Sequence, residues 1–556
     1  MTDFLTPDIS EGRNWRGLER AVARMLSHAG WKNISIVGRS GDKGADIIGS
    51  FDTGDKISSW VIQVKSVSGP DYVGPKAIDE AIHAQPYYNV SSICVATNGE
   101  FTESAKRRKQ VLIDNGFPTE LWNGAFLRAM MDALPSRSIN YKNPHKYQQK
   151  IIDRVIDEYK NGSRKGLYVV ATGLGKTLIA ASIANEFWNM GLHRILVLCH
   201  VKELALQLEQ GFWTQLDKSI PTSFFFEGRF PNTSEGITFG LYQTLYGTLS
   251  GLNPDTYDVI IVDEAHHAPS GCFSTCLNHL KPKYILGMTA TPWRGDGKDI
   301  CDIFGQPLEK VSLVDGMAMG YLSKVDYHIL CDNIDWEEMQ EMSKLSLSIR
   351  DLNKRLFLPQ RDDAAISEIL KAIKSISNPK IAVFSPTIEH SIKFSEMLNA
   401  AVITSKPLSS KTPEEGYVRR RKLMDFATGK LMAITAVDVL NEGIDVPDVN
   451  VLVFLRATHS RRIFIQQLGR GLRVADNKDH VTVLDFVSDV RRIADVIEID
   501  NEAKEKGTEK EIVYLKDGIV SFSNQHFEKF VTAWLKDVAD LGDSSDTSKL
   551  SFPEVD

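Results

Sequence analysis

The amino-acid sequence predicts an α/β protein made of several domains. With 556 residues, the chain is long enough for three or four domains that each bury a hydrophobic core. Short apolar runs alternate with amphipathic stretches in two successive blocks, 145–323 and 324–492, and this alternation is typical of parallel, doubly wound sheets. A smaller α/β block at 1–134 precedes them, and the polar stretch 135–144 indicates a linker.

The individual elements follow from hydrophobic periodicity, taken in chain order. In the N-terminal block we expect helices at 18–29 and 76–87, with strands at 34–37, 45–50, 60–65 and 92–96. The second block should contain strands at 167–170, 194–199, 236–239, 259–262 and 284–288. A helix at 336–354 should precede the strands of the third block at 380–385, 432–436, 449–455 and 481–486. The C-terminal extension, 493–556, should hold a helix at 526–541 and a solvated acidic tail.

Composition excludes several classes of protein. The chain is 42% hydrophobic and 25% charged, as in ordinary globular proteins. Its net charge of −7 argues against a uniformly basic nucleic-acid coat, although local basic patches could still bind DNA. The six cysteines are scattered, which favours a reduced, cytoplasmic protein over a disulfide framework or a zinc module. The sequence shows neither a secretory signal nor an apolar run of membrane-spanning length, so no membrane partner is expected.

A glycine-rich loop after the first strand of the second block is the clearest chemical signal. It reads TGLGKT, and its glycines allow backbone N–H groups to curl around a polyphosphate. Lys176 can reach the terminal phosphates, and Thr177 offers a hydroxyl to Mg²⁺. Val170 stands where the strict loop pattern has glycine, so the match depends on the rest of the chain. We expect the phosphates of a nucleoside triphosphate to be held by Thr172, Gly173, Leu174, Gly175, Lys176 and Thr177.

Two carboxylates follow another apolar strand of the same block. Asp263 and Glu264 come directly after the strand at 259–262, at its C-terminal end. That position suits coordination of Mg²⁺ by Asp263 and activation of the attacking water by Glu264. The loop and the carboxylates together predict hydrolysis of a nucleoside triphosphate.

The third block carries residues that could complete this site. Gly443 and Asp445 follow the strand at 432–436. Arg470 and Arg473 are three residues apart, which places them on one face of a helix. Such a pair can enter the ATP site of a neighbouring domain and stabilise charge on the transferred phosphoryl group. Surface arginines on an exposed helix are the alternative.

In their order along the chain, these segments resemble the motif set of superfamily 2 helicases over about 145–492. The similarity is greatest to DEAH-type members related to type I and type III restriction motor subunits and to RadD-like repair helicases. The resemblance implies two RecA-like lobes that clamp ATP between them, with nucleic acid lying across both. It also implies that Gln148 reads the adenine, with Gln149 as the alternative, and that His200, Lys202, Gln207 and Thr435 stand near the bound strand. The other matching residues are Lys176, Thr177, Asp263, Glu264, His266, Thr289, Thr291, Gly443, Asp445, Gln466, Arg470 and Arg473.

The N-terminal block carries a second set of polar residues. Asp46 lies in one expected strand, and Gln63 and Lys65 lie two residues apart on the next, so both face the same side of the sheet. If the two strands are adjacent, the three side chains can converge at one edge. A carboxylate and an amide oxygen are hard ligands for Mg²⁺, and a neighbouring lysine can orient water and stabilise the reacting phosphate. Glu19, on the preceding helix, could add a carboxylate through water. A small α/β domain with incidental polar residues is the alternative.

This arrangement resembles the PD-(D/E)xK nucleases, and in particular the Mrr-like restriction endonuclease domain, over about 15–134. The segments that carry the resemblance are 18–19, 41–46, 63–65 and 95–102. Gln63 replaces the Glu or Asp of the wider superfamily, as it does in the Mrr branch, and this removes one negative charge from the metal site. The resemblance implies a nuclease fold that hydrolyses phosphodiester bonds with Mg²⁺ held by Asp46 and Gln63.

Together, the two resemblances imply an ATP-dependent DNA helicase or translocase coupled to a metal-dependent endonuclease of restriction or antiphage type. The expected cofactors are ATP and Mg²⁺. The expected partners are DNA, double-stranded or with single-stranded regions, and companion restriction subunits. Two alternatives stay open. One is a DNA repair helicase whose N-terminal domain mainly binds or trims DNA, and the other is a motor that carries a non-cleaving DNA-recognition module.

Overall fold

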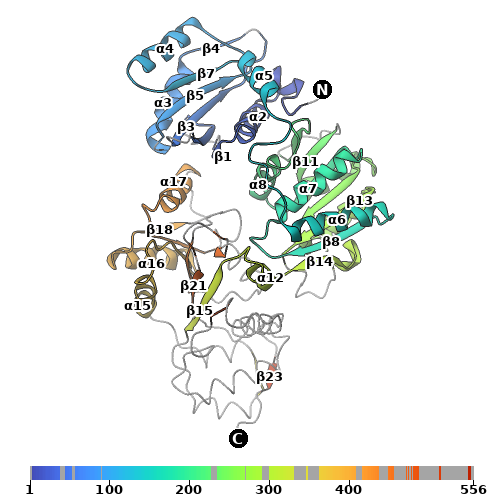
Figure 1. Ribbon diagram of the computed structural model, residues 1–556, viewed down its shortest axis with the longest axis vertical. Coiled ribbons are helices and arrows are strands. Elements are labelled where there is room, and N and C mark those ends of the chain that lie inside the picture. Colours follow the sequence, from blue (N-terminus) through green and yellow to red (C-terminus); the bar gives the residue numbers. More distant parts are fainter. Residues whose placement is uncertain are drawn as a thin grey trace.

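The chain folds into three successive blocks, each built on its own sheet (Figure 1). The computed structural model describes residues 3–37, 44–52, 57–69, 71–88, 90–226, 235–269, 271–290, 300–330, 346–348, 362–408, 416–437, 449–455, 471–472, 474, 478, 480–486, 513–514 and 549–551. Within these residues the expected α/β class is confirmed, with two parallel sheets after a mixed N-terminal sheet. No helix in this part of the chain combines the length and the apolar character needed to cross a bilayer.

The N-terminal sheet joins an antiparallel half to a parallel half. β1 (Lys32–Ile36), β2 (Ile47–Asp52) and β3 (Ile57–Lys65) pair antiparallel, and β5 (Ser92–Thr97) and β7 (Thr119–Trp122) continue from β3 in parallel. α2 (Trp15–His28) and α5 (Gly124–Ala133) cover one face, and α3 (Lys76–Tyr88) covers the other. Successive residues of β3 reach opposite faces, since Val61 packs with α3 and Ile62 packs with α2. The remaining elements are α1 (Pro7–Ser10), β4 (Tyr72–Val73), β6 (Glu100–Phe101) and α4 (Glu103–Asp114).

The second block is a parallel sheet covered by helices. Its described strands pair in the order β10-β11-β9-β12-β13-β8-β14, and each pair is parallel. β12 is buried along its whole length, which is why its sequence is a continuous apolar run up to Asp263. The strands are β8 (Lys165–Val170), β9 (Arg194–Cys199), β10 (Thr222–Phe225), β11 (Gly236–Leu241), β12 (Val259–Asp263), β13 (Tyr284–Thr289) and β14 (Pro307–Val311). The helices are α6 (Lys146–Lys160), α7 (Lys176–Asn189), α8 (Lys202–Trp213), α9 (Tyr242–Thr248), α10 (Gly271–His279), α11 (Cys301–Phe304) and α12 (Leu313–Ala318), with short 3₁₀ turns at Leu249–Gly251 and Ala265–His267.

The third block repeats this architecture. Its described strands pair in the order β18-β19-β17-β20-β21-β15-β22, again in parallel. The strands are β15 (Lys324–Leu330), β17 (Ile381–Phe384), β18 (Ser405–Leu408), β19 (Ala433–Ala436), β20 (Val451–Phe454), β21 (His480–Phe486) and β22 (Val513–Tyr514). The described helices are α15 (Asp362–Ile373), α16 (Ile388–Ala400) and α17 (Gly416–Ala427).

Two expectations for the C-terminal half are wrong where the structure describes it. Residues Ser346–Ser348 form strand β16, not part of a helix over 336–354. β16 pairs antiparallel with β23 (Lys549–Ser551), so the acidic tail contributes a strand and is not wholly solvated. Here the conformation depends on hydrogen bonds between two strands that are far apart in the sequence. Such pairing cannot be predicted from the spacing of apolar residues within one segment. The expected helix at 526–541 lies outside the described residues.

The N-terminal block is docked firmly on the second block. Trp213, at the end of α8, is 2% exposed and belongs to the hydrophobic core that α2 and α5 form with the N-terminal sheet. The buried Arg24 of α2 donates to the carbonyls of Ile220 at 2.8 Å and Asp217 at 3.0 Å, and its guanidinium lies 4.2 Å from the centroid of the Phe4 ring. The stretch expected to be a linker is bound as well, because Asn140 donates to the Ser27 and Trp31 carbonyls. The two blocks therefore share one interface, which we call the α2–α8 junction.

Candidate active sites

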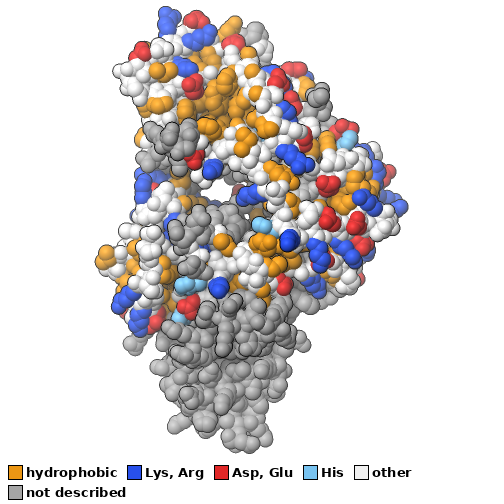
Figure 2. All heavy atoms as spheres, in the orientation of Figure 1, with side chains coloured by type: hydrophobic (Ala, Val, Ile, Leu, Met, Phe, Trp, Pro, Cys, Tyr) orange, Lys and Arg blue, Asp and Glu red, His pale blue; other side chains and the backbone are white. Residues whose placement is uncertain are grey.

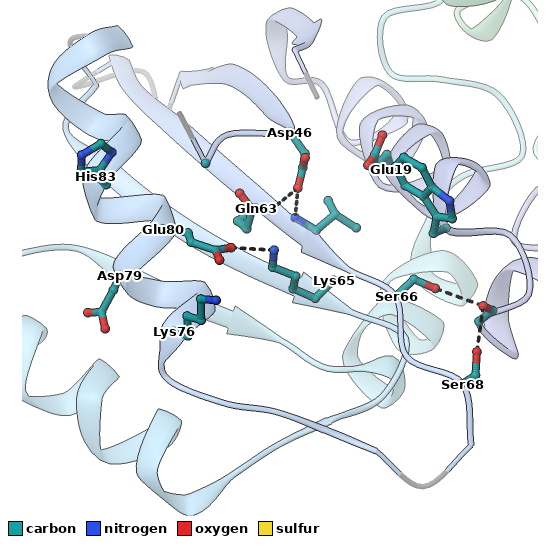
Figure 3. A pocket seen from close by; sticks show the side chains of 14 residues that line it. Glu19, Asp46, Gln63, Lys65, Ser66, Ser68, Lys76, Asp79, Glu80 and His83 are labelled. Carbon is teal, nitrogen blue, oxygen red and sulfur yellow. Dashed lines mark hydrogen bonds and ion pairs between the residues drawn. The ribbon is translucent and has the colours of Figure 1, made fainter. Parts of the chain in front are cut away.

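A polar pocket opens at the edge of the N-terminal sheet where the predicted nuclease residues converge (Figure 3). Its volume is about 1060 Å³, and its walls come mainly from the end of strand β3, helices α2 and α3 and the segment just before β2. Asp46, Gln63, Lys65 and Glu19 all line it, so the structure brings together the four residues that the sequence nominated for this chemistry. Ile47 of β2 faces Ile62 of β3, and this register places Asp46 beside Gln63.

Asp46 and Gln63 form the buried end of this pocket. They are 6% and 5% exposed, respectively. One carboxylate oxygen of Asp46, Oδ2, accepts hydrogen bonds from Gln63 Nε2 and from the backbone N–H of Val64, both at 2.6 Å. These bonds turn the other side of the Gln63 amide, Oε1, away from Asp46, and Oε1 has no hydrogen-bond partner among the described residues. A buried acceptor without a donor is costly unless something binds it, and an amide oxygen beside a carboxylate suits Mg²⁺. The residues present therefore fit the metal that the fold implies.

Lys65 is held by a residue that the motifs did not indicate. Its Nζ lies 2.6 Å from Oε2 of Glu80, which projects from α3 into the same pocket (Figure 3). Glu19 reaches the pocket from α2 and is 7% exposed. The sequence contains one weak signal for Glu80, because it lies on α3 beside the buried positions Ile78 and Ala81 and so near the sheet.

The phosphate-binding loop has the backbone shape that its sequence predicts. Gly173 and Gly175 have φ angles of 92° and 78°, in the left-handed region that favours glycine. Gly175 is also the N-cap of α7, so the N-terminus of that helix and its free N–H groups face the loop. A Cβ atom at Gly175 would lie 2.5 Å from Nε2 of Gln148, and the loop could not keep its present contact with that residue.

Gln148 anchors this loop to α6. Its Nε2 donates to the Leu174 carbonyl at 3.1 Å, and its Oε1 accepts from the backbone N–H of His145 at 2.9 Å. The Tyr147 hydroxyl donates to the same Leu174 carbonyl at 2.6 Å, and burial raises the pKa of that tyrosine to about 12. Tyr321 packs beside this group, with its ring tilted and its centroid 5.0 Å from that of Tyr147. Gln148 thus lies next to the loop, and reading of adenine by its side chain stays a prediction.

Lys176, Asp263 and Glu264 form a charged cluster at the same edge of the sheet. Lys176 Nζ lies 3.4 Å from Glu264 Oε1, and Asp263 ends β12 and is 9% exposed. Glu264 has a φ of 46°, which is rare for a residue with a side chain and indicates local backbone strain at the site. His266 connects the cluster to β13, since its Nδ1 lies 3.0 Å from the Thr289 hydroxyl and 3.3 Å from Glu264 Oε2.

Burial and charge push the two carboxylates of this cluster in opposite directions. Burial, together with the neighbouring Glu264 carboxylate, raises the pKa of Asp263. Burial also raises the pKa of Glu264, but Lys176 and His266 outweigh it and lower the pKa overall. Glu264 is therefore ionised at neutral pH, which a base requires. A divalent cation at Asp263 would favour ionisation of that side chain as well.

Some of the predicted site residues lie outside the part of the chain that the structure describes, and one described residue, Thr435, does not fit its expected role. Gly443, Asp445, Gln466, Arg470, Arg473 and Thr291 lie outside the described residues. Thr435 on β19 is fully buried and donates to the Ser391 carbonyl at 2.7 Å, so it cannot contact a nucleic-acid strand in this structure. Its position was implied by the helicase motifs, but the hydroxyl is used to tie α16 to β19.

Three family models match the chain in succession. Residues 11–131 match a model described as restriction endonuclease, residues 141–294 match type III restriction enzyme, res subunit, and residues 363–475 match helicase conserved C-terminal domain. These matches cover the N-terminal, second and third blocks in that order.

Individual relatives are identical to the chain at about a quarter of the aligned residues. The type I restriction enzyme EcoAI endonuclease subunit of Escherichia coli is 26% identical over 451 residues, which cover 72% of this chain and 53% of that subunit. The DNA 3'-5' translocase XPB2 of Sulfurisphaera tokodaii is 25% identical over 386 residues, which cover 63% of this chain and 83% of the translocase. The chain spans about half the length of several curated relatives that it matches. Among solved structures, the ATP-dependent type ISP restriction-modification enzyme LlaBIII bound to DNA aligns with 94% of this chain and 38% of that one, at 16% identity and a TM-score of 0.50, and this likeness concerns the fold alone.

Proposed function

We propose that this chain, which carries a restriction endonuclease domain followed by two helicase domains, is an ATP-dependent DNA translocase or helicase that also cleaves DNA. Its role would be restriction or antiphage defence in the cytoplasm. One observation carries the proposal: Asp46, Gln63 and Lys65 meet in a single pocket that a DNA phosphate could enter. A module that only gripped DNA would not need a carboxylate, an unpartnered amide oxygen and a lysine at one point.

In the nuclease pocket, Asp46 and the Oε1 atom of Gln63 would hold Mg²⁺, because both supply oxygen ligands. The ion would supply a Lewis acid that polarises the phosphodiester and lowers the pKa of water. Lys65, on the same face of β3 as Gln63, would bind the scissile phosphate and orient the water. Glu19 would add a carboxylate from α2 through a bridging water.

At the ATP site, the loop 172–177 would wrap the phosphates with backbone N–H groups, and Lys176 would bind the terminal ones. Thr177 and Asp263 would hold the Mg²⁺ that accompanies ATP. Glu264 would take the proton of the attacking water, a role for which its side chain must be ionised, as it is at neutral pH. Gly443, Asp445, Arg470 and Arg473 would complete the site from the second helicase lobe, with the arginines stabilising charge on the transferred phosphoryl group.

The arrangement of the three blocks supports DNA as the common substrate. Figure 2 shows an opening between the blocks with Lys and Arg side chains beside it, which is a local basic feature on a chain of net negative charge. The matched relatives include a restriction endonuclease subunit and a DNA translocase. Companion subunits that recognise sequence or methylation would complete a restriction system, as the likeness to a subunit of a type I restriction enzyme suggests.

The deciding experiment is cleavage of a supercoiled plasmid with Mg²⁺, with and without ATP. The wild-type chain should nick or linearise the plasmid. Asp46→Ala should lose cleavage but keep DNA-stimulated ATPase activity, because Asp46 lies outside the ATP site. Asp79→Asn is the matched control, since Asp79 lines the same pocket but pairs with Arg108 at 3.0 Å.

Two outcomes would redirect the proposal. Equal cleavage by the wild-type chain and Asp46→Ala would remove the nuclease assignment. DNA-stimulated ATPase activity without any cleavage by the wild-type chain would favour a motor whose N-terminal domain binds or recognises DNA.

A further inference from the structure

The position of Lys65 in the nuclease pocket depends on a contact that the catalytic motif does not contain. Lys65 ends β3, and its flexible side chain carries the ammonium out of the sheet into the pocket. Glu80 lies on the other wall, on α3, and its Oε2 is 2.6 Å from Lys65 Nζ (Figure 3). This distance is that of a short charge-assisted hydrogen bond.

Two other carboxylates around the pocket, Asp46 and Asp79, have different partners. Asp46 accepts from Gln63 and Val64. Asp79, adjacent to Glu80 in the chain, points to Arg108 at 3.0 Å. The ion pair at 2.6 Å shows that the fold directs Glu80 at Lys65. Helix α3 holds Glu80 there, because Ile78 and Ala81 on either side of it are buried against the sheet.

The charges of the pocket explain why such a contact matters. Gln63 is neutral, so β3 supplies no second carboxylate beside Asp46 that would attract Lys65 toward the buried end. A lysine side chain has a flexible four-carbon stem, so its ammonium group can occupy many positions unless a partner holds it. The ion pair with Glu80 selects one of these positions for the Lys65 ammonium. Because the side chains of Lys65 and Glu80 are 36% and 33% exposed, solvent screens the pair and its main effect is on position, not on stability.

We propose that Glu80 is the positioning residue of the nuclease site: it holds the Lys65 ammonium at the pocket wall where the scissile phosphate enters. This inference rests on the proposed nuclease function. It assigns Glu80 an action through Lys65 and none on the metal, which Asp46 and Gln63 would bind. Displacement of a reacting group by about 1 Å can lower a rate by about a hundredfold, so the loss of this contact should be visible in catalysis.

The first test measures the contact itself and needs no cleavage. The full-length chain is treated briefly with an acetylating reagent, and modification of each lysine is followed by mass spectrometry. Glu80→Gln should raise the rate at Lys65 by about two- to fivefold, the range expected for breaking a partly exposed ion pair. Lys76, which lines the same pocket, serves as the internal reference. Asp79→Asn is the matched control and should leave Lys65 unchanged.

The second test measures plasmid cleavage against DNA and Mg²⁺ concentration. Glu80→Gln should lower kcat by about tenfold to a hundredfold while leaving KM for DNA and the half-saturating Mg²⁺ concentration unchanged. Glu80→Asp, which keeps the charge one methylene shorter, should recover part of the rate. A carboxylate that merely supported folding would not give this separation of kcat from metal affinity.

The outcomes separate this inference from the proposed function. Unchanged acetylation of Lys65 in Glu80→Gln would overturn the inference, and so would a rise in the half-saturating Mg²⁺ concentration, because Glu80 would then act on the metal. Cleavage at equal rates by the wild-type chain and Lys65→Ala would instead overturn the nuclease function, while the acetylation result would still report whether Glu80 holds Lys65.

Discussion

At the scale of single residues, Lys176 links the phosphate-binding loop to the carboxylate cluster. It belongs to the loop, and its Nζ lies 3.4 Å from Glu264 Oε1. We expect Lys176→Ala to abolish ATP turnover, since the loop sequence 172–177 contains no other cationic residue. Glu264→Gln should still bind ATP but hydrolyse it about 10²- to 10⁴-fold more slowly, because the amide keeps the shape and loses the base. Phosphate release and binding of a fluorescent ATP analogue measure the two effects.

The control for these substitutions is Arg154→Ala, which removes an exposed cation from α6 that pairs with Glu158 at 3.7 Å. It should turn over ATP like the wild-type chain. Wild-type turnover by Lys176→Ala would show that ATP binds elsewhere.

Residues that share a local pattern could be predicted from the sequence, and residues brought in by packing could not. Gln63 and Lys65 are two apart on a strand, so their common face follows from the pleat. Asp46 joins them because β2 and β3 are neighbours, which a short connection made foreseeable. Glu80 enters the pocket only because α3 crosses the end of β3, and no spacing in the sequence encodes that crossing. The catalytic roles of all these residues remain predictions.

At the scale of elements, α8 connects the ATP site to the rest of the molecule. Gly211 in this helix lies so close to the loop that a Cβ atom there would be 2.6 Å from Cγ2 of Thr177. Alanine normally stabilises a helix relative to glycine. We nevertheless expect Gly211→Ala to lower ATPase kcat by about tenfold or more, because Thr177 must shift. Steady-state ATPase assays and thermal unfolding would show lost activity without lost stability.

Gly247→Ala provides a matched control for that substitution. Gly247 is also a helical glycine, in α9, and a Cβ atom there would meet nothing within 4 Å. Equal ATPase rates in both variants and the wild-type chain would mean that Thr177 tolerates the added methyl group.

Most buried central strands were predictable as elements, whereas several edge strands were not. The edge strand β1 was expected at 34–37, and the inner strand β15 was not expected. The central strands of both parallel sheets are continuous apolar runs, and each expected one is present. β7, β10, β14 and β18 lie at or next to sheet edges and were not predicted. β18 reads SKPL, and proline is tolerated there because an edge strand needs only one neighbour. Such segments take their conformation from the strand beside them.

At the scale of the whole molecule, the α2–α8 junction should make the N-terminal block and the second block unfold together. Burial lowers the pKa of the Arg24 guanidinium to about 9, so it stays charged at neutral pH and needs its two carbonyl partners. Arg24→Met should destabilise the junction by about 2–4 kcal/mol, because both carbonyls lose a donor. Calorimetry should then resolve separate transitions for the two blocks.

Arg13→Met tests the same chemical change at an exposed position. Arg13 has an exposed side chain that pairs with Glu11 on the surface. The Arg13→Met variant should unfold like the wild-type chain. If the wild-type chain already showed separate transitions for the two blocks, they would not unfold as one unit.

Acid should weaken this junction through His28. The imidazole is fully buried, and burial together with the Arg24 charge lowers its pKa from 6.5 to about 3. Below about pH 6.5, His28 is protonated in the unfolded chain but stays neutral in the folded chain. The free energy of unfolding therefore falls as the pH drops below about 6.5. His28→Phe should remove this part of the pH dependence while keeping the ring contact with Phe4. Urea unfolding at several pH values measures it, with the exposed His83→Phe as control.

Trp213 has a consequence for where a cut would fall. Because this side chain of the ATP-binding lobe is part of the core of the N-terminal block, the nuclease pocket cannot swing on a tether. On a moving motor, the nuclease pocket would keep a fixed position relative to the ATP-binding lobe. The distance along the DNA from the motor to the cut would then be constant. Mapped ends from a stalled complex should therefore cluster at one offset, and a flexible insertion within 135–144 should not spread them, since α8 rather than the connecting chain sets the spacing.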